Sequence, residues 1–145
     1  MAVKRKRSTR RSDTSLELLS LYTFFLDRAL ESNLLRDSLK QMGARVEMHN
    51  YHFQDDAEDV DWLPVIARRG WVILSKDQYN WLERRAIKHA GGRAFLLVRC
   101  DLPGEEQATI ISKALPEMLR VTDLTPAPFI AKTYRDGSVH LTKLD

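Results

Sequence analysis

The sequence has very little cysteine, since Cys100 is the one thiol among 145 residues. A lone thiol cannot close an internal disulfide or build a cysteine zinc cluster. No base that would activate it can be identified, so we expect Cys100 to be an inert buried thiol. A chain without disulfides is typical of a reducing cytoplasm.

Long hydrophobic runs are also missing. No apolar stretch approaches the roughly 20 residues that a membrane helix needs. The amino terminus lacks the apolar core and cleavage site of a signal peptide. We therefore expect a cytoplasmic protein with no membrane partner. The histidines lack the spacing of metal ligands, and only His52, in an acid-rich loop, remains a candidate; the four are His49, His52, His89 and His140.

Acidic residues are absent from the first 12 positions, which hold six of the 23 basic residues. The other 17 basic residues stand against 20 acidic ones, so this tail accounts for the net charge of +3. We predict a basic, disordered extension over residues 1–20 and one domain over residues 21–145. The extension could solubilise the protein or act as a nuclear localisation signal, but we favour a weak, nonspecific attraction to nucleic acid.

Strands and helices alternate regularly along the rest of the chain. Short apolar or alternating segments predict strands at residues 21–26, 44–49, 71–75 and 93–98. Helices are predicted from a cap at Ser32, around Pro64, over residues 78–89 and over residues 104–120, with Pro116 kinking or dividing the last one. A β-hairpin turning at Asp136 and Gly137 follows. This order predicts a three-layer α/β/α fold with a central, mostly parallel sheet and a C-terminal β-hairpin.

Two of the predicted strands run into an aspartate, Asp27 after the first and Asp77 after the third. The carboxyl ends of parallel strands meet at one edge of a sheet, so both carboxylates should share a cleft. Paired carboxylates repel each other unless a cation neutralises them. Mg²⁺ suits such a site and can activate water against a phosphodiester. Asp59 and Asp61, in the loop that enters the second helix, are the natural third and fourth contributors.

Each of these acids also has a structural interpretation. Asp27 could open a loop, and Asp77 could cap the helix predicted from residue 78. Asp59 or Asp61 could cap the helix that contains Pro64, because proline is best tolerated in a first turn. For Asp27 and Asp77 we favour the functional interpretation, since two independent strands deliver the same group to the same edge. For Asp59 and Asp61 both interpretations stay open.

Charged residues flank the two strand-end acids. Arg28 and Lys76 could contact a substrate phosphate or could balance the acidic charge. Asp101, beyond the fourth strand, could be a further ligand, but its Leu-Pro-Gly context favours a turn. The three tryptophans are expected to pack in the core or on the domain surface; they are Trp62, Trp71 and Trp81.

Four segments resemble the PIN-like domains, and in particular their VapC-like toxin branch. They are residues 24–28 (Phe-Phe-Leu-Asp-Arg), 59–64 (Asp-Val-Asp-Trp-Leu-Pro), 70–77 (Gly-Trp-Val-Ile-Leu-Ser-Lys-Asp) and the tail over 126–137. The resemblance covers about residues 22–140 and leaves out the basic extension. It implies that the first predicted strand is central in the sheet.

The resemblance also implies an activity. PIN-like toxins are Mg²⁺- or Mn²⁺-dependent endoribonucleases in which three or four acids bind the metal and activate water. Asp27 and Asp77 match the first-strand and third-strand acids. The acid at the helix entrance maps to Asp59 or Asp61, with Val60 interrupting the usual run, and the fourth acid has no match. Such toxins face a small antitoxin and often self-associate, so RNA, an antitoxin and a second copy of this chain are the expected partners.

Two other functions remain in view from the sequence. A noncatalytic RNA- or partner-binding module could keep the fold without a complete acid set. A receiver-like phosphoacceptor domain also places acids at strand ends. Receiver domains offer an acidic pair after the first strand, however, whereas Asp27 lies between Leu26 and Arg28. The metal-dependent ribonuclease is the favoured hypothesis.

Overall fold

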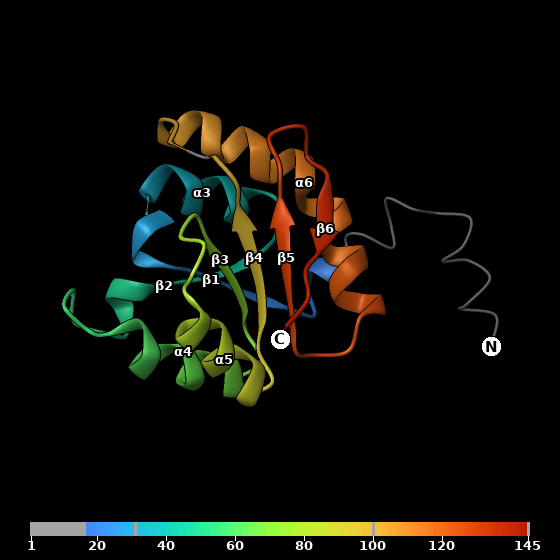
Figure 1. Ribbon diagram of the computed structural model, residues 1–145. Helices are drawn as coiled ribbons and strands as arrows, with labels where there is room; N and C mark the ends of the chain where they lie inside the picture. The colour runs from blue at the N-terminus through green and yellow to red at the C-terminus, as the bar shows by residue number, and fades with distance from the viewer. Residues whose placement is uncertain (1–16, 31, 100, 145) are drawn as a thin grey trace.

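A six-stranded sheet forms the middle of the protein (Figure 1). The structure is a computed structural model that describes residues 17–30, 32–99 and 101–144. The strand order is β2-β1-β3-β4-β5-β6. The strands are β1 (Thr23–Leu26), β2 (Arg45–Met48), β3 (Val72–Ser75), β4 (Arg93–Leu97), β5 (Phe129–Thr133) and β6 (Val139–Leu141). The first five run parallel and β6 pairs antiparallel with β5, which confirms the predicted fold class and the terminal hairpin.

Four helices cover the two faces of this sheet. On one face lie α3 (Asn33–Gln41) and α6 (Gly104–Leu124), which contact each other. On the other face lie α4 (Asp59–Arg68) and α5 (Trp81–His89), which also pack together (Figure 1). Two short 3₁₀ turns, η1 (Arg28–Leu30) and η2 (His49–Tyr51), follow β1 and β2. Within the described ranges no helix is long and apolar enough to cross a membrane.

The two faces of the sheet have different cores. Successive strand residues point to opposite faces, so Phe24 and Leu26 of β1 join one core and Phe25 joins the other. The core under α3 and α6 is largely aliphatic. The core under α4 and α5 is built around Phe25 and Trp62, whose ring centroids lie 5.2 Å apart. Both faces of β1 are therefore buried, which holds the end of this strand in place; β1 is an interior strand, second from the edge formed by β2, and not the middle of the sheet as the resemblance implied.

Helix starts and ends follow local signals. Ser32 caps α3 as predicted, because its hydroxyl accepts a hydrogen bond from the Leu35 N–H at 3.2 Å. Glu58, not Asp59 or Asp61, is the N-cap residue of α4, so Pro64 lies in the second turn. Helix α6 continues through Pro116 without dividing. Pro116 lies on the exposed side of α6, where water can satisfy the carbonyl that loses its N–H partner.

The amino-terminal region is described only from residue 17. The predicted disordered extension therefore lies mostly outside the described residues, as does Cys100, and its boundary at residue 20 stays a prediction. Residues 17–19 are helical, and Leu18 and Leu19 are buried against the aliphatic core. The described part thus includes packed side chains on the amino-terminal side of residue 21.

Candidate active site

Asp27 directly follows β1 and is 1% exposed. Its backbone N–H donates to the Leu74 carbonyl at 3.0 Å, which extends the pairing with β3 by one residue. Its Oδ2 accepts hydrogen bonds from the Ser75 hydroxyl at 2.7 Å and from the Tyr79 hydroxyl at 2.6 Å. Among the described residues no donor to Oδ1 is found. Asp27 is thus a buried carboxylate with one oxygen held by two hydroxyls.

Tyr79 reaches Asp27 through an uncommon backbone conformation. Its φ is 49°, in the left-handed region that residues other than glycine rarely adopt. Its side chain is buried, and burial raises the pKa of the phenol well above the usual value, as does the neighbouring Asp27 charge. Tyr79 therefore remains a neutral donor to Asp27. The sequence carried no signal for this contact, which spans 52 positions.

Asp77 lies two residues beyond β3 and is exposed. Its backbone N–H donates to the Ser75 hydroxyl at 3.0 Å, so Ser75 contacts both strand-end aspartates. Partial burial raises the pKa of the Asp77 carboxyl, and repulsion from Asp27 and Asp59 raises it further. The two strand-end acids therefore share one electrostatic environment at the carboxyl edge of the sheet, as predicted from the strand pattern.

Asp77 does not cap the helix that follows. Helix α5 begins at Trp81, three residues later than predicted, and Asn80 is its N-cap. The Asn80 side chain accepts from the Glu83 N–H at 2.9 Å, and the Glu83 carboxylate accepts from the Asn80 N–H at 2.8 Å. This reciprocal pair satisfies the first turn. The capping interpretation of Asp77 is wrong, and its side chain is left for another role.

Only one of the two acids at the start of α4 faces this cluster. Asp59 accepts from the Trp62 indole N–H at 3.0 Å, and its charge contributes to the raised pKa of Asp77. Asp61 is exposed, and its carboxylate makes no hydrogen bond or ion pair with the described residues. Residues two apart on a helix point about 200° away from each other, so both cannot face the same site. The structure brings Asp59 to the cluster and leaves Asp61 outside it.

Glu83 is a fourth acid that the sequence prediction missed. Burial raises the pKa of its carboxyl, and a side-chain hydrogen bond with Asp59 together with the nearby Asp77 charge raises it further. The Asn80-x-x-Glu83 spacing, a capping box, was a readable signal for the helix start. It carried no information on which acids Glu83 would meet. Four carboxylates therefore gather here: Asp27, Asp59, Asp77 and Glu83.

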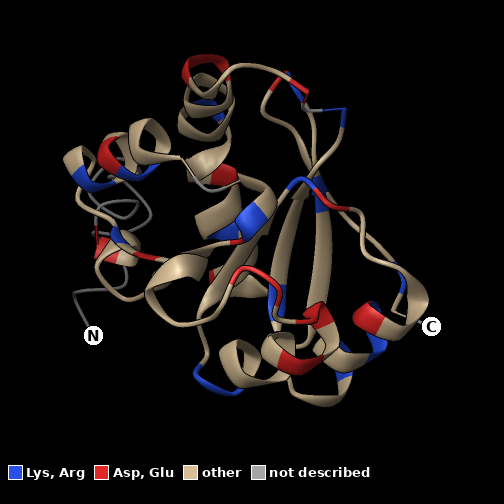
Figure 2. Ribbon diagram, turned by 90° about the vertical axis from the view of Figure 1, so that its left-hand side faces the viewer, with Lys and Arg blue, Asp and Glu red and all other residues tan. Residues whose placement is uncertain are grey.

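Basic residues border the acid cluster. Arg28 NH2 lies 3.5 Å from Asp59 Oδ1, and Lys76 Nζ lies 3.9 Å from Asp101 Oδ1. The Asp101 side chain is fully exposed, in keeping with the turn that we favoured for it. Figure 2 shows Lys and Arg stretches next to Asp and Glu stretches in the middle of this side of the molecule. In the structure as it stands, Arg28 and Lys76 offset acidic charge.

The histidines near β2 have other partners. His52 Nε2 lies 2.7 Å from Glu47 Oε1, so this histidine pairs with a residue of the preceding strand β2. His49 is fully buried, with its ring 5.4 Å from the ring of Phe53 and 5.3 Å from that of Trp62. Neither histidine makes a hydrogen bond or ion pair with the four carboxylates, and we do not include them in the candidate site.

The donor atoms of the cluster suit a hard divalent cation, since Mg²⁺ and Mn²⁺ favour carboxylate oxygens. Burial is the main cause of the raised pKa values of Asp77 and Glu83, and repulsion from neighbouring acids, which a cation would relieve, adds to it. Within residues 17–30, 32–99 and 101–144, however, no three acidic, histidine or cysteine side chains lie close enough to enclose a metal ion. The cluster therefore fits a cation in chemistry and charge, and its exposed members must draw closer to hold one.

Comparison with known proteins agrees with this architecture. A family model described as a PIN-like domain matches residues 23–99, which includes β1 to β4 and all four carboxylates. The chain belongs to the PIN-like domain family. It is 28% identical over 120 residues to a protein of Mycobacterium tuberculosis named "Putative ribonuclease VapC45", and the match covers 78% of this chain and 86% of that relative. No solved structure matches the chain significantly. The predicted resemblance to PIN-like, VapC-type proteins is confirmed.

Proposed function

We propose that this protein is a metal-dependent endoribonuclease that hydrolyses RNA phosphodiesters. The observation that carries the proposal is the cluster of four carboxylates, two of them with raised pKa values, at the carboxyl edge of a parallel sheet. Membership of the PIN-like family and the name of the mycobacterial relative support it.

The four carboxylates would bind the metal in different ways, according to how deeply each is buried. Asp27, held by Ser75 and Tyr79, would present its Oδ1 as the fixed metal ligand. Asp77, which is exposed, would turn toward the same cation. Asp59 would complete the set, and Glu83, whose carboxyl interacts with Asp59 and Asp77, would bind the cation with it. We no longer include Asp61, because it faces away from the other acids.

A bound Mg²⁺ or Mn²⁺ would supply an activated water and stabilise negative charge on the phosphodiester. In the overall reaction the water oxygen forms a bond to phosphorus, one bridging P–O bond breaks, and the displaced ribose oxygen takes up a proton. Arg28 and Lys76, beside the acids, would contact the phosphate of the substrate. No covalent intermediate with the protein is needed.

The direct test is cleavage of single-stranded RNA with Mg²⁺, with Mn²⁺ and with a chelator. We expect cleavage with either metal and none with the chelator. Asp27→Asn and Asp77→Asn should each lower the rate by more than about a hundredfold, the upper range for loss of a group that only supports a metal ligand. Asp61→Asn is the matched control, since it neutralises a nearby acid that faces away.

Two results would contradict the proposal. Undiminished cleavage by both Asp27→Asn and Asp77→Asn would show that the site is elsewhere. Equal losses in Asp61→Asn and Asp59→Asn would overturn the choice between these two acids.

We further propose that the protein is the toxin of a toxin–antitoxin pair acting in the cytoplasm, with a small antitoxin as partner and a homodimer as the active form. This rests on the likeness to VapC-type proteins. Expression alone should arrest growth, and Asp27→Asn should relieve the arrest. A growth arrest that persists in Asp27→Asn would separate toxicity from the acid cluster.

A noncatalytic RNA- or partner-binding module is the second candidate. The observation that favours it is that no three side chains of the described part enclose a metal site. Calorimetry with Mn²⁺ separates the two functions, because a binding module should take up no metal at millimolar concentration. Membership of the PIN-like family leaves the receiver-like alternative without support.

A further inference from the structure

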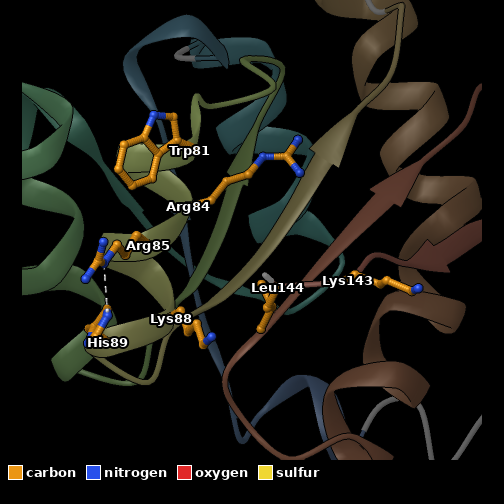
Figure 3. A pocket seen from close by; sticks show the side chains of 7 residues that line it. All are labelled: Trp81, Arg84, Arg85, Lys88, His89, Lys143 and Leu144. Atoms are coloured by element: carbon orange, nitrogen blue, oxygen red, sulfur yellow. Dashed lines mark hydrogen bonds between the residues drawn. The ribbon is translucent and has the colours of Figure 1, made fainter.

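A basic groove lies beside helix α5, outside the acid cluster. It has a volume of about 430 Å³ and is bounded on one side by α5 and on the other by Lys143 and Leu144 of the C-terminal tail (Figure 3). Among the residues that the structure describes, every ionisable side chain that lines it is basic; they are Arg84, Arg85, Lys88, His89 and Lys143. The groove therefore has the opposite charge to the acid cluster and would attract an anionic chain.

The basic side chains of the groove differ in whether they already make hydrogen bonds within the protein. Arg84 donates to the backbone carbonyls of Gln78 and Tyr79, at 2.8 Å and 3.0 Å. It therefore joins the groove to the loop that carries Tyr79. The side-chain ammonium groups of Lys88 and Lys143 make no hydrogen bond or ion pair with any described residue, so they are available to a ligand.

Trp81 is the most exposed aromatic side chain of the groove, at 64%. Figure 3 shows its ring on α5, apart from the sheet. The Arg85 guanidinium lies 5.9 Å from the ring centroid. Large aromatic side chains left this exposed commonly mark binding surfaces. An open indole face beside a cation offers a stacking platform for a nucleic-acid base.

The groove follows one side of α5. Its residues on this helix recur three or four positions apart, which is the spacing of one helix face; they are Trp81, Arg84, Arg85, Lys88 and His89. Glu83 lies two positions from Trp81 and so points to another side of the helix, with the acid cluster. From Trp81 to His89 the helix rises about 12 Å, so a strand lying along the groove would meet the Trp81 ring at one end and Lys88 near the other.

We propose that this groove binds single-stranded RNA, with a base stacked on Trp81 and backbone phosphates at Arg85, Lys88 and Lys143. The proposal rests on the proposed function, because it names the substrate segment that this site would hold. Stacking favours unpaired bases, since a duplex keeps its base faces covered. The groove would add contacts to RNA phosphates beyond the one that Arg28 and Lys76 would meet at the acid cluster.

The test is binding of a fluorescein-labelled oligouridylate, measured by fluorescence anisotropy in the presence of a chelator so that cleavage does not interfere. Trp81→Ala should weaken binding by about tenfold or more, as loss of one stacked base does, whereas Trp81→Phe should stay within about threefold. Lys88→Glu should weaken binding about tenfold and flatten its dependence on salt. Lys40→Glu is the matched control, because Lys40 is also an exposed lysine in a last helical turn, on the opposite face of the sheet.

A second measurement uses the tryptophan itself. Trp62 is buried, so the oligouridylate should quench the fluorescence of Trp81, and the quenching should be lost in Trp81→Phe. Binding that is unchanged in both Trp81→Ala and Lys88→Glu would overturn the proposal. So would a polyglutamate peptide that binds through Lys88 where the oligouridylate does not, which would assign the groove to an acidic protein partner.

The outcomes keep this inference separate from the proposed function. Trp81-dependent binding without metal-dependent cleavage would retain the groove and reject the nuclease. Cleavage that depends on Asp27, together with binding that is insensitive to Trp81 and Lys88, would retain the nuclease and reject the groove.

Discussion

The ends of β1 and β3 look alike in the sequence and differ in the folded protein. Asp27 follows β1 at once, is 1% exposed and accepts two hydroxyl hydrogen bonds. Asp77 lies two residues past β3, is exposed and carries a raised pKa. Ser75 joins the two, since its hydroxyl donates to Asp27 and accepts from the Asp77 N–H. The same residue type at one sheet edge thus becomes a fixed anchor in one strand and an adjustable charge in the other.

The largest expected effect is the response of the two acids to metal. If the cluster binds Mn²⁺, a concentration of a hundred times Kd should stabilise the native protein by about 2.7 kcal/mol. Asp27→Asn should abolish this gain, because the anchor loses its charge while its amide oxygen still accepts from Ser75 and Tyr79. Asp77→Asn should reduce the gain. Thermal melts with and without Mn²⁺ measure this stabilisation, and Asp61→Asn is the control. If Asp27→Asn kept the full stabilisation by Mn²⁺, Asp27 would not be the fixed metal ligand.

Removing the Ser75 hydroxyl, which contacts both aspartates, should have the next largest effect. Ser75→Ala removes one donor to a buried carboxylate and the acceptor of the Asp77 N–H, and should cost about 1–3 kcal/mol in free energy of unfolding. Ser138→Ala is the matched control, since Ser138 also donates to an aspartate, Asp136, but in an exposed turn. Its loss should stay below about 0.5 kcal/mol. Urea unfolding measures both, and equal losses would mean that burial of Asp27 does not matter.

Tyr79→Phe should weaken the hydrogen bonding of Asp27 and leave the contacts of Asp77 unchanged. Removing the phenol hydroxyl takes away one hydrogen bond to Asp27 and should cost about 1 kcal/mol of stability. Cleavage should fall by about tenfold, because a group that orients a metal ligand is lost. Tyr51→Phe, whose hydroxyl lies on the surface and accepts from Arg36 at 3.3 Å, should leave cleavage unchanged. Cleavage rates that do not separate these two variants would remove Tyr79 from the site.

The smallest effect concerns the charge of Asp77 itself. Its folded-state pKa is raised above the usual 3.8, so the ionised form destabilises the native state without metal once the pH rises through the folded-state pKa. Asp77→Asn should therefore be more stable than the wild type at neutral pH, by less than about 1 kcal/mol because Asp77 is exposed and its repulsion is screened. The difference should disappear below pH 3.8, where the carboxyl is protonated in both states. Melts in chelator across this range test it, and a difference that grows on acidification would contradict the sign.

The tryptophans, like the two aspartates, are alike in the sequence and differ in the folded protein. All three were expected in packing roles, and Trp62 is indeed buried in the core beneath α4. Trp81 is exposed instead, because α5 buries only Ile87 and turns its first residue outward. The composition of α5 does not show which of its side chains face the sheet. That depends on the positions of its apolar residues around the helix axis.

The sequence by itself determined the parallel α/β architecture, the strand-end position of Asp27, the Ser32 cap and the hairpin at Asp136 and Gly137. These features depend on near neighbours, through side-chain alternation, capping hydrogen bonds and turn preferences. It also determined that Asp77 would come to the same edge as Asp27, because parallel strands end together.

Only the tertiary structure decided which acids meet. Asp59 and Asp61 are equivalent as local sequence, and the rotation of α4 against the sheet separates them. Glu83 joins the cluster because α5 starts at Trp81, and Tyr79 reaches Asp27 across 52 positions from a left-handed backbone. Contacts of this kind arise from how distant elements pack, and that packing is set by the two cores rather than by any residue next to the site.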